Sequence, residues 1–292
     1  MSESRHNPDQ LLKEIQADEE NRNKGHLKIF FGYAAGVGKT YAMLEAAHME
    51  KQQGIDVVAG YVETHARPKT AALLNGLEVL PTREVFYNGM ILDEFDIGMA
   101  LKRKPQLILV DELAHTNAEG CRHAKRYQDI KELLNAGIDV YTTVNVQHIE
   151  SLCDTVASIT EIDVRERIPD SIFDNADQVE LIDIEPQDLI NRMNTGNVYR
   201  QTQAKQAVEN FFTIENLTAL REISLRRCAD RVNILTENTR IKNHGDYHTG
   251  EHILVCLSSS PSNAKIIRTA AKMASAFKGE LSLIHISEPT RR

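Results

Sequence analysis

The residues with the clearest chemical meaning lie in one glycine-rich stretch, GYAAGVGKT, at positions 32–40. An apolar run precedes this stretch and a helical pattern follows it, which is the context of a phosphate-binding loop. Glycines allow backbone N–H groups to converge on phosphate oxygens, and a helix N-terminus adds a favourable dipole. A lysine at the end of the loop reaches the β- and γ-phosphates, and the next hydroxyl coordinates Mg²⁺. The predicted nucleotide-binding residues here are Gly36, Val37, Gly38, Lys39 and Thr40, with Thr40 also a ligand of the nucleotide's Mg²⁺.

The first glycine of the loop departs from the standard spacing. The pattern G-x-x-x-x-G-K-[ST] requires glycine at position 33, where this chain has Tyr33, and the glycine is one residue earlier at Gly32. The other motif residues are intact, so we still expect the loop to bind nucleotide. The alternative is a glycine-rich turn between strand and helix with a chance lysine.

Paired acids follow a second apolar run, QLILVDE at 106–112. Asp111 lies where a carboxylate would hold Mg²⁺, and we predict it as both a nucleotide-binding residue and a metal ligand. Glu112 is the candidate catalytic residue, placed to act as a general base toward an attacking water. The alternative is an ordinary acidic strand end. Arg122 and Arg126 follow closely, but the sequence offers no obvious arginine finger.

Polar residues also follow two other predicted strands. Glu63, Thr64 and His65 come after the second strand, and a group from position 142 to position 148 comes after the fifth. Ligands of open α/β sheets bind at the carboxyl ends of strands, so we expect these residues to face the same crevice as Lys39. They would sense the γ-phosphate or bind a second partner; capping and loop hydrogen bonds are the alternative. The second group comprises Thr142, Thr143, Asn145, Gln147 and His148.

The elements that must position these residues follow an α/β pattern. Short apolar runs at 27–31, 55–61, 84–87, 106–110 and 138–144 alternate with helical stretches at 40–53, 93–103 and 124–135. Strands that are buried on both faces read as continuous apolar runs, so the alternation predicts a parallel sheet covered by helices. The fold class is therefore predicted as a P-loop NTPase-like α/β domain.

The C-terminal part is organised differently. A possible strand at 179–184 precedes a helix starting near Pro186, and a longer helix is predicted over 216–233. The strand 252–257, the helix 263–277 and a strand after Gly279 form one βαβ unit, which is too small to be stable alone. We therefore expect a polar tail at 1–24, the P-loop domain at 25–232, a linker at 233–250 and an incomplete α/β domain at 251–292.

Composition limits the classes of function. The chain has 292 residues, 34 Lys and Arg against 42 Asp and Glu, and a net charge of −8, which argues against binding to nucleic acid. No run approaches the ~18 apolar residues of a membrane span, and the N-terminus does not resemble a secretory signal. The four cysteines form no CxxC pair and are interpreted as reduced cytosolic thiols.

A serine-rich turn, SSSPSN at 258–263, lies between the strand and the helix of the C-terminal unit. Its hydroxyls and the following helix N-terminus would suit a phosphate group. A cluster of serine N-caps explains the same residues equally well.

Five longer segments resemble a known family. FFGYAAGVGKTYAMLEAA, GYVETHARPKTAALLNGLEVLP, DELAHTN, GIDVYTTVNVQHIESL and NLTALREISLRRCADRV run in order between residues 27 and 232. They resemble the cytoplasmic N-terminal domain of the Kdp sensor histidine kinases, which respond to potassium and osmotic conditions. The P-loop of that family also has its first glycine one residue early. The resemblance therefore implies that Tyr33 is compatible with ATP binding.

The resemblance extends to the C-terminal residues. The next module of the family is similar to universal stress proteins, and in some members it binds cyclic di-AMP through a [AGC]-x-S-x-S-x-x-N turn. Cys256, Ser258, Ser260 and Asn263 satisfy this pattern, and Arg268 is the nearest basic residue that follows. The resemblance implies a cyclic di-AMP site at Ser258, Ser260, Asn263 and Arg268.

The resemblance also implies a role. The chain is expected to be a cytoplasmic regulatory fragment of a two-component sensor kinase that controls potassium uptake, with ATP and Mg²⁺ as ligands. Its partners would be its own kinase core, a response regulator and a second copy in a dimer, with the full-length parent in the plasma membrane. No phosphoacceptor-histidine box occurs, and the ending SEPTRR is expected to be an artefact of a truncated gene sequence. The alternatives are a free-standing P-loop ATPase and a scaffold that binds no nucleotide.

Overall fold

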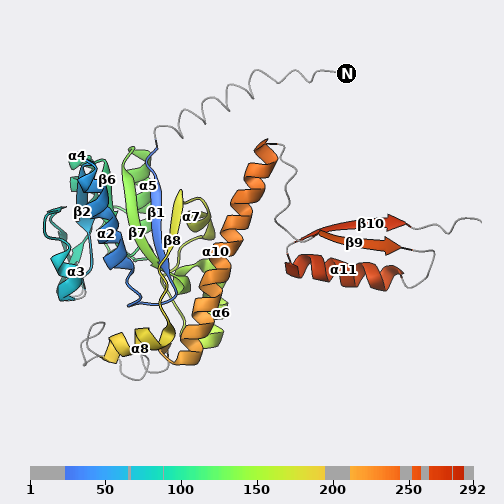
Figure 1. Ribbon diagram of the computed structural model, residues 1–292. Coiled ribbons are helices and arrows are strands. Elements are labelled where there is room, and N and C mark those ends of the chain that lie inside the picture. The colour runs from blue at the N-terminus through green and yellow to red at the C-terminus, as the bar shows by residue number, and fades with distance from the viewer. Residues whose placement is uncertain are drawn as a thin grey trace, which may run out of the picture. The chain divides into compact units, whose positions relative to one another are not determined.

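The computed structural model describes residues 24–64, 67–87, 89–194, 211–243, 252–257, 263–277 and 279–285 (Figure 1). The chain divides into two compact units, Met1–Arg226 and Arg227–Arg292. The larger unit contains the glycine-rich loop and the paired acids, and the smaller one contains the serine-rich turn.

A six-stranded sheet forms the centre of the larger unit, and all of its neighbouring strands are parallel. The order across the sheet is β3-β2-β6-β7-β1-β8, so β7 lies between the strand before the glycine-rich loop and the strand before the paired acids. This confirms the predicted α/β fold class. The strands are β1 (Leu27–Gly32), β2 (Val57–Tyr61), β3 (Glu78–Val79), β6 (Leu107–Val110), β7 (Asp139–Asn145) and β8 (Gln178–Leu181).

Burial explains why these runs form strands. All four residues of β6 are buried, as are five of the six in β1, because helices cover both faces of the sheet (Figure 1). On one face Phe30, Leu107 and Leu109 pack with Met43 and Leu44 of helix α2 (Lys39–Gln52). Side chains alternate between the faces of a strand, so Phe31 points the other way and contacts Phe173 with ring centroids 4.8 Å apart.

Shorter helices connect the strands. The helix after the paired acids, α5, begins at Arg126, two residues after the predicted start, and ends at Asn135 as expected. The remaining helices of the larger unit are α3 (Pro68–Ala72), α4 (Ile97–Arg103), α6 (Cys153–Thr160), α7 (Asp170–Asp174) and α8 (Pro186–Asn194), with two short 3₁₀ turns at Val146–His148 and Glu150–Leu152.

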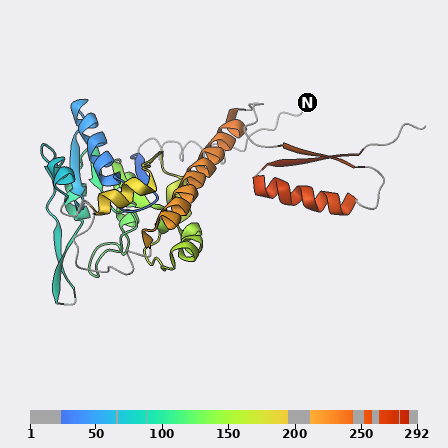
Figure 2. The ribbon, with the colours of Figure 1, turned by 60° about the horizontal axis from the view of Figure 1, so that its bottom comes forward.

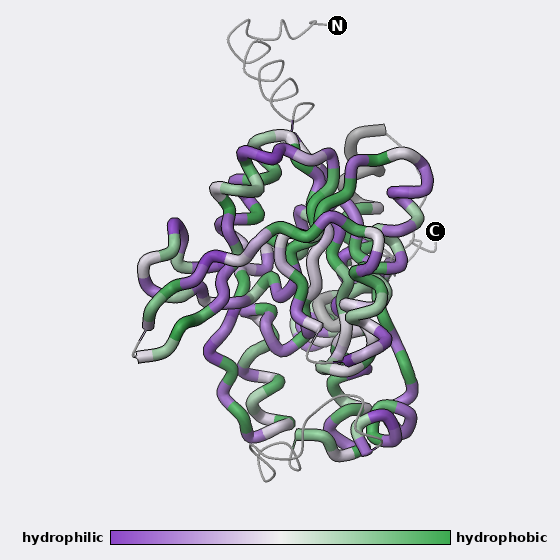
Figure 3. Tube along the Cα trace, turned by 90° about the vertical axis from the view of Figure 1, so that its left-hand side faces the viewer, coloured by the Kyte–Doolittle hydropathy of each residue, from purple (hydrophilic) through white to green (hydrophobic). Residues whose placement is uncertain are grey.

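The predicted strand at 84–87 does not belong to the parallel sheet. It lies in β4 (Arg83–Tyr87), which pairs with β5 (Met90–Glu94) in an antiparallel hairpin that projects from the unit (Figure 2). The helix predicted over 93–103 begins only at Ile97, where the Asp96 side chain caps it by accepting a hydrogen bond from the Met99 N–H. Hydrophobic residues lie toward the hairpin tip (Figure 3), among them the exposed Phe86 and Ile91. A short run such as EVFY at 84–87, with three apolar residues, could not distinguish this hairpin from a core strand.

The long helix α10 (Ile214–Asn243) continues eleven residues into the range 233–250 that was predicted as a linker. Beyond it the structure has β9 (His252–Leu257), α11 (Asn263–Phe277) and β10 (Glu280–His285), with β9 and β10 parallel. This matches the single βαβ unit expected from the sequence. Of the helices that the structure describes, none combines the length and the hydropathy that a membrane span requires.

Candidate nucleotide-binding site

The glycine-rich loop occupies positions 33–38, directly between β1 and α2. Two of its glycines adopt left-handed backbone conformations, Gly36 with φ 92° and Gly38 with φ 112°, which side-chain-bearing residues rarely adopt. Gly38 is the N-cap of α2, so the unpaired N–H groups of the first helical turn face the loop. The loop therefore has the backbone geometry of an anion-binding helix N-terminus.

The displaced glycine and Tyr33 have a structural explanation. A Cβ atom at Gly32 would lie 2.7 Å from Val37 Cγ2 and 3.2 Å from Lys39 Cδ, so a side chain here would force Val37 to shift. Tyr33 is fully buried, and its hydroxyl donates a hydrogen bond to the Ile184 carbonyl at 3.1 Å. Tyr33, which replaces the glycine of the standard pattern, therefore anchors the loop to the segment that follows β8.

Lys39 is buried, with 8% of its surface exposed, and its Nζ donates a hydrogen bond to the Ala34 carbonyl at 3.0 Å. Burial lowers the pKa of Lys39 to about 8. The carboxylates of Asp111 and Glu112 oppose this effect, while the positive charge of Arg67 reinforces it. The lysine is thus a poorly solvated cation, held against the loop that it is expected to serve.

Asp111 and Thr40 lie together, as the motif predicts. The Thr40 hydroxyl donates to Asp111 Oδ2 at 3.0 Å, and Asp111 is only 2% exposed. The other carboxylate oxygen accepts hydrogen bonds from the Thr143 hydroxyl and the Glu112 N–H. Asp111 is consequently fixed in place from β7 as well as from the loop. The two predicted Mg²⁺ ligands are hard oxygen donors, which is the ligand type that Mg²⁺ prefers.

Glu112 has a strained backbone. Its φ of 59° lies in the left-handed region, which is uncommon for a residue other than glycine. Strained residues cluster at functional sites, where the surrounding structure holds them in place. Its N–H donates to Asp111 Oδ1 at 3.0 Å and to the Thr143 hydroxyl at 3.3 Å. This conformation directs the Glu112 side chain into a pocket that Lys39 also lines.

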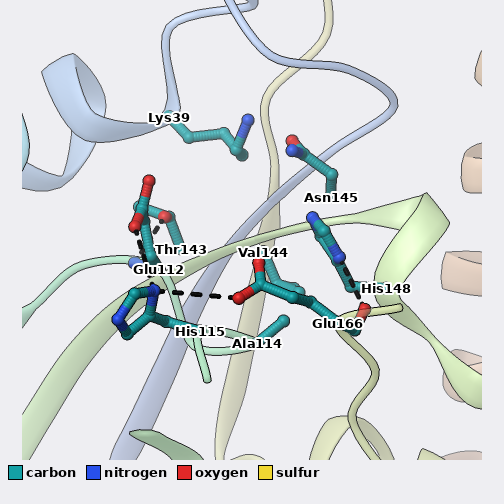
Figure 4. Close-up of a pocket in the computed structure, with 9 residues that line it drawn as sticks. All are labelled: Lys39, Glu112, Ala114, His115, Thr143, Val144, Asn145, His148 and Glu166. Atoms are coloured by element: carbon teal, nitrogen blue, oxygen red, sulfur yellow. Dashed lines mark hydrogen bonds and ion pairs between the residues drawn. The ribbon is translucent and has the colours of Figure 1, made fainter. Parts of the chain in front are cut away.

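That pocket lies at the carboxyl ends of β6 and β7 and brings polar residues from several segments together (Figure 4). Asn145 and Lys39 point into it from opposite sides. Asn145 is paired in register with Gly32, and its buried Oδ1 accepts no hydrogen bond from the residues that the structure describes. Of the predicted strand-end residues, Thr143, Asn145 and His148 line this pocket, whereas Thr142 and Gln147 do not. His65 lies outside the described residues.

His148 is held neutral at the same pocket. Burial lowers its pKa below the usual range, against the opposing effect of its hydrogen bond to the Glu166 carbonyl. Because Nδ1 lies 2.8 Å from that carbonyl oxygen, Nδ1 carries the proton and donates it, leaving Nε2 as an acceptor. The Glu166 side chain in turn accepts a hydrogen bond from the Thr116 N–H at 2.9 Å. The loops after β6 and β7 are therefore connected through Glu166.

Neither arginine after the paired acids is placed as a finger. Arg126 is fully buried, and its guanidinium donates to Glu94 Oε2 at 3.0 Å and stacks on the Tyr61 ring. Arg122 forms an ion pair with Glu132 at 2.5 Å. Arg192 of α8, which sequence reasoning missed, lies beside the glycine-rich loop instead: a Cβ at Gly38 would be 3.9 Å from its Nη1. No sequence signal connects position 192 to the loop, because α8 reaches it only through the tertiary fold.

The predicted cyclic di-AMP residues belong to the smaller unit. Ser258 and Ser260 lie outside the described residues, whereas Asn263 is the first residue of α11 and Arg268 is exposed on the same helix. Cys256 is exposed near the end of β9. The strand β9 ends at Leu257 and the helix α11 begins at Asn263.

Comparison with known proteins gives one consistent result. Residues 23–232 match the family model KdpD, described as the osmosensitive K⁺ channel His kinase sensor domain. The sensor protein KdpD of Clostridium acetobutylicum is 56% identical over 285 residues, which cover 97% of this chain and 32% of that protein. The sensor protein KdpD of Escherichia coli K12 is 50% identical over 290 residues, 98% of this chain and 32% of that protein.

A relative from Synechocystis is shorter. It is 46% identical over 269 residues, which cover 92% of this chain and 72% of the relative. In contrast, the chain spans about a third of the length of the Clostridium and Escherichia proteins.

Proposed function

Because the chain belongs to the KdpD family of osmosensitive potassium-channel histidine-kinase sensor domains, we propose that it is a nucleotide-dependent regulatory input. It binds ATP·Mg²⁺ at the glycine-rich loop and passes the state of that site to a kinase core. Through a response regulator, the kinase adjusts potassium uptake during potassium limitation or osmotic stress. The parent protein is a dimer in the bacterial plasma membrane, and this part of it lies in the cytoplasm.

One observation carries the nucleotide-binding part of this proposal. The Thr40 hydroxyl and the Asp111 carboxylate come from segments 71 positions apart, yet they lie 3.0 Å from each other. Lys39 lies next to them, at the N-terminus of α2. This is the donor set that a nucleotide-bound Mg²⁺ requires, with a cation beside it for the phosphates.

Each residue around the loop has its own role toward a bound nucleotide. The N–H groups of the loop and of the first turn of α2 bind phosphate oxygens. Lys39 leaves the Ala34 carbonyl and pairs with the phosphates, which compensates for the cost of burying its charge. Thr40 and Asp111 are the Mg²⁺ ligands, and the metal neutralises phosphate charge when bound. Thr143 keeps Asp111 in position throughout.

A free-standing ATPase is the second candidate, and the strained Glu112 favours it. With its carboxylate in the pocket beside Lys39, Glu112 would accept a proton from an attacking water. Phosphate release in steady state distinguishes this candidate. Turnover that Glu112→Gln abolishes while ATP binding persists would support an ATPase, and binding without turnover supports a sensor.

The serine-rich turn supports a second regulatory ligand, cyclic di-AMP. The turn connects β9 to α11, a helix of 15 residues whose N-terminal N–H groups suit a phosphate. Ser258, Ser260, Asn263 and Arg268 are the proposed contacts. Titration of cyclic di-AMP into the chain tests this, with Asn263→Ala as the variant that loses binding.

The regulatory role is tested in the full-length protein. Lys39→Ala should change the potassium dependence of kinase signalling, measured from the expression of a potassium-uptake reporter. An unchanged potassium response would remove the regulatory role from the glycine-rich loop. No binding of ATP at all would leave the scaffold alternative.

A further inference from the structure

We infer that Arg192 of helix α8 is a phosphate-binding cation of the nucleotide site, a role that rests on the proposed binding of ATP·Mg²⁺. Arg192 is 153 positions from Lys39 in the sequence and belongs to no nucleotide-binding motif. It nevertheless supplies a second positive charge at the glycine-rich loop, on the side of Gly38.

The geometry at Gly38 carries this inference. Gly38 has no side chain, and a Cβ atom there would lie 3.9 Å from Arg192 Nη1 and 4.0 Å from Ile182 Cγ2. The guanidinium therefore lies at van der Waals distance from the position that a side chain at Gly38 would occupy. Since Gly38 caps α2, this is the position where the N–H groups of the loop and of the helix converge. A phosphate held by those groups comes within reach of the guanidinium.

The segment that leads into helix α8 is held by contacts with the loop and with α10. The Tyr33 hydroxyl donates to the Ile184 carbonyl, which ties the segment before α8 to the loop itself. Arg221 of α10 donates to the Asp183 carboxylate at 2.7 to 3.0 Å and to the Glu185 carboxylate at 2.7 Å. Leu189 of α8 is completely buried. These contacts place the start of α8, and with it Arg192, beside the loop.

The chemistry of the side chain fits the ligand. The planar donors of a guanidinium match phosphate oxygens in a bidentate geometry. Arg192 is exposed on α8, so its replacement should leave the core intact.

Calorimetric titration of the whole chain with ATP·Mg²⁺ and with ADP·Mg²⁺ tests the inference. Arg192→Gln should weaken the binding of both nucleotides at least tenfold, because a charge-assisted hydrogen bond to phosphate is lost. Arg192→Lys keeps the charge without the planar donors and should restore part of the affinity. The matched control is Arg226→Gln, since Arg226 is an exposed arginine of α10 that pairs with Glu222 four residues earlier. The control should bind within twofold of the wild type.

The outcomes separate this inference from the proposed function. If the wild type binds ATP·Mg²⁺ and Arg192→Gln binds it equally well, Arg192 has no role at the phosphates although nucleotide binding stands. If the wild type binds neither nucleotide, both proposals fail. Thermal unfolding followed by circular dichroism verifies the fold of each variant. Should Arg192→Gln fail to fold, an Arg192→Lys variant with wild-type affinity for both nucleotides would overturn the inference.

Discussion

Raising the pH from 7.5 to 9.0 should weaken the binding of ATP·Mg²⁺, because Lys39 loses its proton in the free protein. Burial lowers the pKa of Lys39 to about 8 when no nucleotide is present. Phosphate oxygens around Nζ favour the charged form and raise the pKa in the complex. The complex therefore holds a proton that the free protein gives up as the pH rises through 8.

The magnitude follows from that pKa. With a value of about 8, Lys39 is about 76% protonated at pH 7.5 and about 9% protonated at pH 9.0. If only the protonated form binds phosphate, the affinity falls about eightfold between the two pH values. Below about pH 7 the contribution of Lys39 is almost complete, and each further pH unit above about 9 costs about tenfold in affinity.

Calorimetry at both pH values, in buffers with different enthalpies of ionisation, measures the affinity and the proton uptake together. At pH 9.0 each bound nucleotide should take up about 0.9 proton. Lys39→Arg is the control, because a guanidinium stays protonated and its affinity should not change over this range. Equal affinities at both pH values without proton uptake would refute the reasoning, as would an equal loss in the Lys39→Arg variant.

Three other substitutions test separate parts of the account. Asp111→Asn should remove most of the Mg²⁺ dependence of ATP binding, seen by titration with and without Mg²⁺; an unchanged dependence would mean that Asp111 is no ligand. Asn145→Ala should weaken the binding of ATP about fivefold and leave the binding of ADP unchanged, because the Asn145 amide lines the pocket next to Lys39. Equal losses of affinity for both nucleotides would contradict this placement. Phe30→Ala should lower the free energy of unfolding in urea by about 3–5 kcal/mol, since the ring is fully buried under α2, and a loss below 1 kcal/mol would argue against that packing.

The sequence predicted the core of the sheet well, for a physical reason. All four residues of β6 and five of the six in β1 are buried, and their nearly continuous apolar runs are difficult to confuse with other structure. It did not predict the β4–β5 hairpin. Phe86 and Ile91 are apolar but exposed, so their hydrophobicity imitates a buried strand.

In the candidate site, too, some residues could be predicted from the sequence and others could not. Lys39, Thr40 and Asp111 could be predicted because their chemistry requires a fixed local pattern after a strand. The order of the strands could not be predicted from the sequence. This order places β7, which carries Thr143 and Asn145, between the loop and Asp111. Such neighbours depend on tertiary packing, and no short-range pattern encodes them.

A crystal structure of the chain with Mg²⁺ and a non-hydrolysable ATP analogue would show whether the glycine-rich loop binds nucleotide. We expect phosphate density within the loop at 33–38, Lys39 Nζ moved from the Ala34 carbonyl to the phosphates, and Mg²⁺ between Thr40 and Asp111. A loop that stays empty at saturating analogue, with Lys39 still bound to Ala34, would contradict this expectation.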